Sequence, residues 1–397
     1  MKTSTLTIFS FFAFATGGES ADADSSTVNL LTGEGVSVGG VLFPSVSFQS
    51  AFGTSTADPG ELLSGHHDPD REGFTVQNVE FSLTAKLSER LSLFGTYAAK
   101  IDLDDRWQGS FEEYYATLSG LPLGATFKGG RFLPHFGFHN QNHPHDFTML
   151  DQHIASGRIL GDDGIRLYGG EIYLPVLRSL STGWEDQLVF AFGKTPVAEE
   201  EEHGHEKLAF EAEGGLFNDW AATAHYGLTF AATSNTLHTF GAFGAWGDNR
   251  SGLSTQIYGT GYEYLWRAEG SLRQPHHEQS EFVKWRTEAF TRCFGAVSAA
   301  EARRDFTDFA AYSVLTYGVA GGKWQAHLRG EYASGIADAG LPERWRVSPA
   351  VTWIPPQSLS LNWKLQYNYD HSPSFGDEHS VWLQFNLHWG AGCAHAH

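Results

Sequence analysis

Two stretches of this sequence carry ionisable side chains at alternate positions, where they could face water and dissolved ions. These residues, in segments 282–294 and 323–334, are Lys284, Arg286, Glu288, Arg292, His327, Arg329 and Glu331. Side chains at every second position of a β-strand share one face. Because the intervening residues are largely apolar, we predict two strands that each have one polar face of mixed charge. Such a face could line a pore and select its solutes, or its charges could pair and fill the interior.

The segment 135–164, between two predicted strands, is rich in histidine and long for a surface loop. Its candidate metal ligands are His135, His139, His143, His145 and Asp146. Imidazole nitrogens and carboxylate oxygens are ligands for zinc and similar transition metals. The spacing matches no fixed metal motif such as His-Glu-x-x-His. We therefore expect either a metal-responsive constriction or a loop that these side chains fasten to its surroundings by hydrogen bonds.

Clusters of acidic residues and histidines recur in three further predicted loops, at 66–70, 199–206 and 371–379. The second contains His203 and His205 within a run of glutamates, so we add both to the candidate metal ligands. Together these loops would attract cations by their electric field alone. The alternative is an acidic surface in contact with solvent, on which the histidines have no binding role.

The elements that must position these residues are clearest at the C-terminal end of the chain. In segments 359–370 and 380–389, large apolar residues alternate with polar ones, and aromatic residues stand near both ends of the apolar face. Such a pattern is typical of transmembrane β-strands, whose aromatic residues lie at the two membrane interfaces. Similar segments predict sixteen strands in all, at 39–50, 74–88, 91–101, 111–119, 125–133, 165–174, 187–194, 220–232, 236–247, 255–267, 282–294, 309–320, 323–334, 344–354, 359–370 and 380–389.

The predicted fold is all-β, a transmembrane antiparallel β-barrel of about sixteen strands. An open edge in lipid would leave backbone groups without hydrogen bonds, so we expect the first strand to pair with the last. Short and long connections largely alternate along the chain, as expected of periplasmic turns and external loops. We expect the long connection after the fifth strand to fold into the lumen. About sixteen strands can enclose an aqueous channel, whereas a plugged 22-stranded transporter would need a longer chain.

The two ends of the chain lie outside the predicted barrel. Residues 1–23 have the pattern of a secretory signal peptide, with an apolar run from Leu6 to Ala15 that ends in a small-x-small sequence. No later stretch is apolar enough for a transmembrane helix. We assign residues 24–390 to the barrel. Residues 391–397 form a short tail with one cysteine and two histidines, which could be a soft metal site or an extension without fixed structure.

Composition excludes several classes of function. The formal net charge is −20, whereas a nucleic-acid-binding protein needs a basic surface, so we expect no nucleic-acid partner. The 45 glycines and 14% aromatic residues suit alternating strands joined by polar loops. No nucleophile-elbow motif and no serine spaced to pair with a histidine is recognisable, so we do not expect an enzyme. The sequence requires no cofactor, although its histidine clusters could hold zinc.

One stretch resembles a known family. It runs Gly-Gly-Arg-Phe-Leu-Pro-His-Phe-Gly-Phe-His-Asn at 129–140 and continues with His-Pro-His-Asp-Phe at 143–147 and Leu-Gly-Asp-Asp-Gly-Ile at 160–165. These roughly forty residues are similar to outer-membrane proteins labelled zinc-regulated or TonB-dependent receptor-like, and more distantly to the phosphate-selective porins O and P. The resemblance implies an outer-membrane barrel, and it implies a link to zinc only through those labels. This chain has no recognisable plug or TonB box.

These patterns lead to one expected function and one alternative. We expect a channel in the bacterial outer membrane for passive uptake of small solutes or ions, with an acidic mouth that attracts cations. The alternative is a surface binding protein or receptor for zinc or another divalent metal, with the barrel as its scaffold. The partners would be membrane lipid and small solutes or divalent cations, and the sequence leaves homo-oligomer formation open.

Overall fold

The computed structural model describes residues 37–102, 105–176, 178–179, 184–196, 215–268, 281–297, 302–319, 323–355 and 361–390. The predicted signal peptide, the tail 391–397, His203 and His205 lie outside these residues. The strands are β1 (Leu42–Ser55), β2 (Gly73–Lys86), β3 (Leu91–Ile101), β4 (Trp107–Leu118), β5 (Thr126–Phe132), β6 (Leu167–Leu174), β7 (Arg178–Ser179), β8 (Trp184–Lys194), β9 (Phe217–Thr233), β10 (Thr236–Asn249), β11 (Ser254–Arg267), β12 (Phe282–Val297), β13 (Arg303–Gly318), β14 (Trp324–Ala333), β15 (Arg344–Trp353), β16 (Leu361–Ser372) and β17 (Gly376–Gly390).

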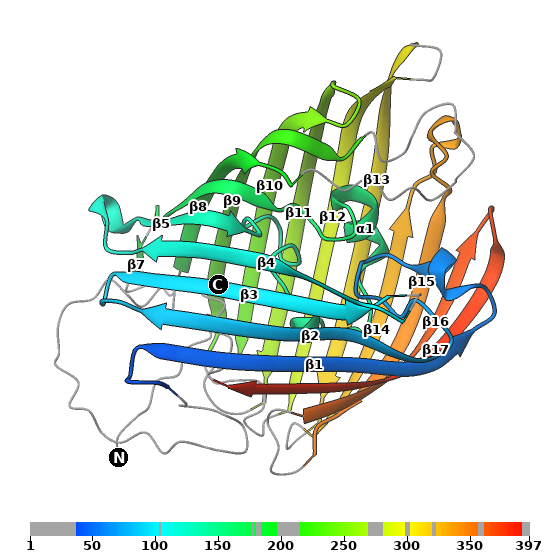
Figure 1. The fold of residues 1–397 in the computed structure, drawn as a ribbon, viewed down its shortest axis with the longest axis horizontal. Coiled ribbons are helices and arrows are strands. Elements are labelled where there is room, and N and C mark those ends of the chain that lie inside the picture. The colour runs from blue at the N-terminus through cyan, green and yellow to red at the C-terminus, as the bar shows by residue number, and fades with distance from the viewer. Residues whose placement is uncertain are drawn as a thin grey trace.

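These strands form one closed antiparallel barrel (Figure 1). Each strand pairs with its neighbours in the chain, and β1 pairs with β17 from Ser45 opposite Gly390 to Ser55 opposite Ser380. The two-residue strand β7 continues the line of β6, because both pair with β8, so the barrel has sixteen strands. Closure leaves no open sheet edge where lipid offers no hydrogen-bond partner. The predicted fold and the pairing of the first strand with the last are confirmed.

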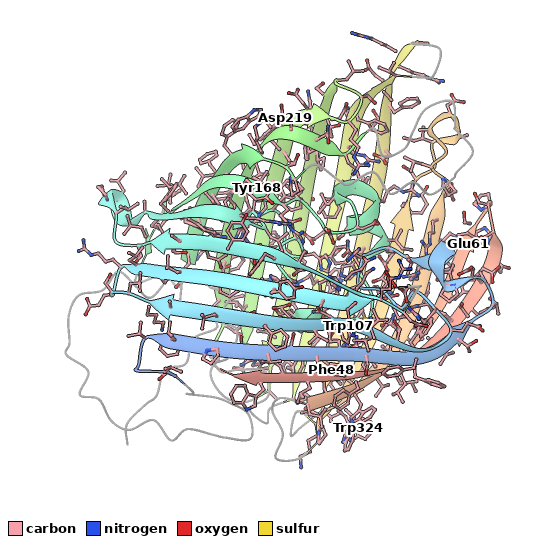
Figure 2. All side chains as sticks on the ribbon, in the orientation of Figure 1. Phe48, Glu61, Trp107, Tyr168, Asp219 and Trp324 are labelled. Atoms are coloured by element: carbon pink, nitrogen blue, oxygen red, sulfur yellow. The ribbon has the colours of Figure 1, made fainter. Side chains whose placement is uncertain are left out.

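The outward face of the barrel is apolar. Side chains such as Leu315, Leu328 and Leu365 are exposed on it. Exposed tryptophan and tyrosine residues lie near both rims, with Trp107, Trp220, Trp246 and Tyr332 towards one and Trp184, Trp285, Tyr317 and Trp324 towards the other. Figure 2 shows Trp324 projecting away from the wall. This is the arrangement expected of a lipid-facing band between two membrane interfaces.

The connections at the two ends of the barrel differ in length. At one end they include the short turns 87–90 and 234–235, and at the other the long segments 56–72 and 133–166. Longer connections are extracellular in barrels of this kind. The helical turns are η1 (Pro59–Leu62), η2 (Pro122–Gly124), η3 (Pro144–Asp146), α1 (Ile154–Leu160) and η5 (Ala337–Ala339). Within the described ranges, no helix is both long enough and apolar enough to span a membrane.

The connection 133–166, which we call the lumen loop, lies inside the barrel. Its helix α1 contacts the wall at β12, β13, β14 and β15, and Figure 1 shows it enclosed by the strands. Apolar side chains of the loop, including Phe136, Met149 and Ile159, join inward-facing wall residues in the main buried core. A loop therefore supplies a large part of what fills this barrel.

Several strands extend further than the alternating pattern predicts. β13 begins at Arg303 instead of residue 309, β4 begins at Trp107 instead of residue 111, and β1 ends at Ser55 instead of residue 50. All three extensions lie at the end with the long connections, where Arg303, Arg304 and Asp305 are exposed. Beyond the lipid, both faces of a strand meet water. The alternation that guides the prediction therefore ends before the strand does.

Candidate functional site inside the barrel

The lumen loop crosses the barrel interior, where polar side chains of the wall bond to its backbone. Glu171 accepts a hydrogen bond from the N–H group of His135 at 2.6 Å. The ammonium group of Lys364 donates to the carbonyl oxygen of Met149 at 3.0 Å. Buried backbone groups outside regular structure need such partners. Much of the polar inner face of the barrel therefore holds this loop in place.

Asp151 is the acidic anchor of the lumen loop. Its Oδ1 accepts a hydrogen bond from Nη2 of Arg329 at 2.7 Å, and its Oδ2 accepts one from Nη1 of Arg346 at 2.8 Å. Both arginines are buried. Burial raises the pKa of Asp151, but the two guanidinium groups outweigh this effect and lower the pKa to about 2. The carboxylate is therefore charged at neutral pH and fastens the loop to β14 and β15.

Two predicted pore residues, Glu288 and Glu331, also bind the backbone of the lumen loop. Oε1 of Glu288 accepts from the N–H group of Phe138 at 2.7 Å, and its Oε2 accepts from the hydroxyl of Tyr312. Glu331 accepts at 2.6 Å from the N–H group of Ile154, the first residue of α1. Both glutamates are buried. They act as loop anchors, away from open water.

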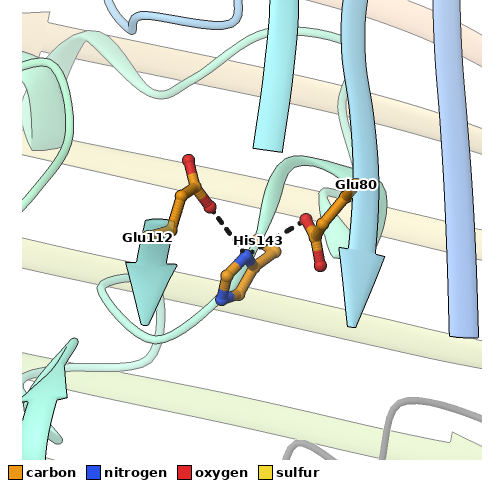
Figure 3. A group of neighbouring side chains, drawn as sticks. All are labelled: Glu80, Glu112 and His143. Atoms are coloured by element: carbon orange, nitrogen blue, oxygen red, sulfur yellow. Dashed lines mark hydrogen bonds and ion pairs between the residues drawn. The ribbon is translucent and has the colours of Figure 1, made fainter. Parts of the chain in front are cut away.

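A second anchor is His143, which lies among three carboxylates from β2 and β4. Its Nδ1 is 3.2 Å from Oε2 of Glu80 and 3.1 Å from Oε2 of Glu112 (Figure 3). Its Nε2 is 2.9 Å from Oε2 of Glu113. We call these four residues the acid–histidine cluster. Burial lowers the pKa of His143, but the carboxylates outweigh burial, so its pKa lies well above the usual value.

Two further histidines border the acid–histidine cluster. Nε2 of His67 is 3.2 Å from Oε1 of Glu112, and Nδ1 of His145 is 3.4 Å from Oε2 of Glu80. Burial lowers the pKa of His67, but the hydrogen bond to Glu112 and the charge of Glu112 raise it by a larger amount. The pKa of His67 therefore lies above its usual value. The cluster and these two neighbours thus form a compact group of carboxylates and imidazoles inside the barrel.

A small cavity lies between the lumen loop and strands β12 and β13. It is partly open to solvent and is lined by His139, Asn142, Thr148, His153, Lys284, Arg286, Val314 and Thr316. Lys284 and Arg286 lie 3.2 and 2.6 Å from Glu263 of β11. Their side chains are 21% and 23% exposed, so both reach water. The charged side chains in this lining are basic.

The histidines beside this cavity are held in the neutral form. Burial lowers the pKa of His139 to about 3, and the charges of Arg286 and Arg329 lower it as well. The pKa of His153 is also well below its usual value, mainly because of burial. His153 stacks on the ring of Tyr312 with centroids 3.7 Å apart. These rings therefore contribute shape and hydrogen-bonding atoms at neutral pH, without charge.

The seven predicted pore residues all lie on the inward face of β12 and β14, in different surroundings. Arg292 is buried and pairs with both carboxylate oxygens of Asp308, at 3.0 and 2.7 Å. His327 bonds to the hydroxyl groups of Thr316 and Thr352 at 3.0 and 2.9 Å. Glu288, Arg329 and Glu331 hold the lumen loop. Lys284 and Arg286 line the cavity and are the residues to test for a role in conduction.

The structure places the predicted metal ligands of the lumen loop in different surroundings. His143 belongs to the acid–histidine cluster, with His145 at its edge and Asp146 3.5 Å from Nε2 of His145. His135 instead packs against His225, with ring centroids 4.3 Å apart. His139 lines the cavity beside β12 and β13. Because the loop crosses the lumen, residues that are close in sequence meet different parts of the wall.

The carboxylates that the sequence-based predictions miss include Glu112, Glu113 and Glu263. Glu112 and Glu113 are adjacent in sequence, yet both are buried inside the barrel. The pairing of β3 with β4 shifts between Thr96 and Tyr97, and this bulge adds one residue to β4. A bulge breaks strict alternation, so the alternating pattern does not reveal this pair. Glu263, by contrast, follows the alternation of its strand. Its position between two tyrosines could have identified it as an inward-facing residue.

No family model matches the chain, and no curated protein matches its sequence. Among the solved structures that resemble it are an anion-selective porin from Comamonas acidovorans (12% identity, TM-score 0.53, covering 88% of this chain and 98% of that one) and the outer membrane channel DcaP of Acinetobacter baumannii (11%, 0.53, 88% and 96%). Salmonella typhi OmpF in complex with daunomycin is a third (11%, 0.52, 88% and 97%). The chain has the porin fold.

At these identities the likeness concerns the fold alone. None of these three proteins is named as a zinc-regulated receptor or as a phosphate-selective porin, so those parts of the sequence resemblance stay predictions. Closed antiparallel barrels with an apolar outer band between aromatic girdles are the membrane-spanning architecture of the bacterial outer membrane. The porin fold of this chain and its outward face therefore place it in that membrane.

Proposed function

We propose that this protein is a porin-like channel for the passive movement of small solutes or ions, in which the lumen loop forms the constriction. The main support is the small cavity between the loop and strands β12 and β13, which is partly open to solvent and is bordered by the partly exposed side chains of Lys284 and Arg286. A barrel of sixteen strands is wide enough for an aqueous channel. A loop folded into that lumen narrows the path and selects what passes.

The charges at this constriction favour small anions. Lys284 and Arg286 bring two positive charges to the cavity, and Glu263 brings one negative charge. Charged side chains at the narrowest point of a pore set its ion preference. The sequence led us to expect a cation preference from the acidic loops, but the field of exposed charges is screened within about 8 Å at physiological salt. We therefore propose that the basic residues inside determine selectivity.

Planar-bilayer recordings of the purified full-length protein test this proposal. We expect stepwise conductance without added metal or an energy source, and a reversal potential in a potassium chloride gradient that shows preference for chloride. Circular dichroism and heat-dependent gel mobility confirm that the sample is folded. A folded protein that does not conduct would reject the channel, whereas a preference for potassium would reject only the assigned constriction.

A surface binding protein or receptor for zinc or another divalent metal is the second candidate. The acid–histidine cluster favours metal binding, at a buried site inside the barrel, because one ligand atom each from Glu80, Glu112 and His143 lie within 4.8 Å of one another. Bilayer recordings separate the two candidates, since a channel conducts without metal and a scaffold with a closed lumen does not.

A further inference from the structure

We propose that the acid–histidine cluster binds one divalent transition metal ion of the zinc class, with Glu80, Glu112 and His143 as its ligands. His143 belongs to the lumen loop, whereas Glu80 lies in β2 and Glu112 in β4. A shared ion would therefore fasten the loop to two wall strands. This role goes beyond passive conduction, because the ion would be a fixed part of the protein and not a solute in transit.

The positions of the ligand atoms suit a single small ion. Nδ1 of His143 is 3.2 and 3.1 Å from the nearest oxygens of Glu80 and Glu112, and the three ligand atoms all lie within 4.8 Å of one another. Zinc binds histidine nitrogen and carboxylate oxygen at about 2.0–2.2 Å, so ligand atoms around it lie roughly 3–4 Å apart. Small side-chain movements therefore suffice to surround an ion.

Glu113 determines which nitrogen of His143 faces the other two carboxylates. Its Oε2 is 2.9 Å from Nε2, a distance at which the ring donates its Nε2 proton. Metal-binding histidines commonly donate their second ring N–H to a carboxylate in this way. In the neutral ring, the lone pair of Nδ1 then points at the oxygens of Glu80 and Glu112. Such an arrangement is repulsive unless a cation, either a metal ion or a proton, lies between them.

The surroundings of the cluster supply a further reason to expect a cation. Glu80 and Glu112 are 1% and 7% exposed, and buried carboxylates are costly unless they are paired. Beside them, the fully buried Asn78 donates from Nδ2 to Oε2 of Glu80 at 3.4 Å. Its Oδ1 has no hydrogen-bond partner within the described part of the chain. An amide oxygen of this kind can accept a hydrogen bond from metal-bound water.

The chemistry of the ligands narrows the choice of ion. Calcium takes six to eight oxygen ligands, and magnesium prefers oxygen and keeps several waters. Two carboxylates and one imidazole instead suit zinc and its neighbours in the first transition series. The competing occupant is a proton on Nδ1 of His143, which would leave the cluster an ion-paired network without metal.

Zinc content measured after equilibrium dialysis tests the proposal. The full-length folded barrel is stripped with a chelator, dialysed against zinc chloride, and compared with the double variant Glu80→Gln/Glu112→Gln. We expect the wild type to hold one more zinc ion per chain than the variant, because glutamine keeps the shape of the site and removes its charge. The matched control is Glu288→Gln, which changes a buried carboxylate that also holds the lumen loop but lies outside the cluster, and it should retain the wild-type content.

A variant of the supporting carboxylate sharpens the test. Glu113→Gln should weaken zinc affinity by about 10–100-fold in calorimetry while the circular dichroism spectrum stays unchanged. Equal zinc content in the wild type and the double variant would overturn the proposal, and so would a wild type that holds no zinc. Should the double variant fail to fold, Glu112→Gln alone gives the same comparison. Zinc content is independent of conductance, so failure here is distinct from failure of the proposed channel.

Discussion

Asp151 of the lumen loop accepts a hydrogen bond at 2.8 Å from Arg346 of β15, although the two residues are 195 positions apart in sequence. Arg346 also donates to Asp370 of β16 at 2.9 Å, so the loop joins an ion-pair network that belongs to the wall. Removing one partner of a buried ion pair costs about 3–5 kcal/mol, because the other charge is left unpaired. The position of the lumen loop therefore depends on buried charges as well as on apolar packing.

Asp151→Asn should release the lumen loop from β14 and β15. The change removes the charge that faces Arg329 and Arg346, and we expect the free energy of unfolding to fall by about 3 kcal/mol. Hydrogen exchange in residues 147–160 should become faster. Asp338→Asn is the control, because Asp338 pairs with Arg304 at the exposed surface, where such a pair is worth less than about 1 kcal/mol. Equal exchange rates in the two variants would show that Asp151 is not an anchor.

Replacing Lys284 and Arg286 by glutamine should shift ion preference towards cations. The change leaves Glu263 as the unpaired charge near the cavity, so the permeability ratio of chloride to potassium should fall several-fold in reversal-potential measurements. The sequence pattern also predicts Arg329 as a pore residue, but its side chain is buried against Asp151. A substitution of Arg329 would therefore change the stability of the lumen loop and not the ion preference. Arg304→Gln, at the outer surface, serves as control, and a double variant with unaltered selectivity would remove the cavity from the conduction path.

Acid should loosen the lumen loop. Burial lowers the pKa values of His135 and His139 to about 3, whereas the value in an unfolded chain is about 6.5. The docked loop keeps both rings neutral, so a released loop takes up protons as the pH falls below about 6.5. Docking is therefore strongest above that pH and weakens towards pH 3, by about 2 kcal/mol per histidine at pH 5. Hydrogen exchange of the loop at neutral pH and at pH 5 measures the effect, and equal protection at both would contradict it.

Leu328→Arg should destabilise the protein in lipid. Leu328 is exposed on the outward face of β14, and an arginine near the membrane midplane costs about 2–4 kcal/mol in a barrel of this type. Leu123→Arg is the matched control, since Leu123 is 88% exposed but lies in the turn η2 at the barrel rim. Urea unfolding in lipid vesicles compares them, and equal stability of the two variants would argue that this face does not meet lipid.

The alternation of apolar and polar residues was enough to predict the strand number and barrel closure. Lipid outside the wall and polar contacts inside it impose a two-residue period on almost every strand, and a closed barrel follows because an open edge is too costly in lipid. The same period also places Lys284 and Arg286 on the inward face. It does not say whether an inward residue meets water, as these two do, or holds a loop, as Arg329 does.

The inner sites depend on features that no short pattern carries. Glu112 and Glu113 share one face only because β4 is bulged opposite β3. Asp151 finds Arg346 only after the lumen loop has crossed the barrel, and Arg292 finds Asp308 through the register of β12 with β13. Such long-range pairings are set by the closed structure as a whole. The histidine-rich sequence therefore indicated the region of the candidate metal site but not its carboxylate partners.

Single-channel conductance before and after loss of the lumen loop tests the central claim most directly. Residues 139–153 are replaced by a short glycine–serine linker, and folding is checked by heat-dependent gel mobility. If the loop is the constriction of a channel, the wild type conducts in small steps and the shortened variant in larger ones, because the closed wall of sixteen strands remains around a wider lumen. A wild type that does not conduct, or a variant with the same single-channel conductance as the wild type, would contradict the proposed function of this barrel.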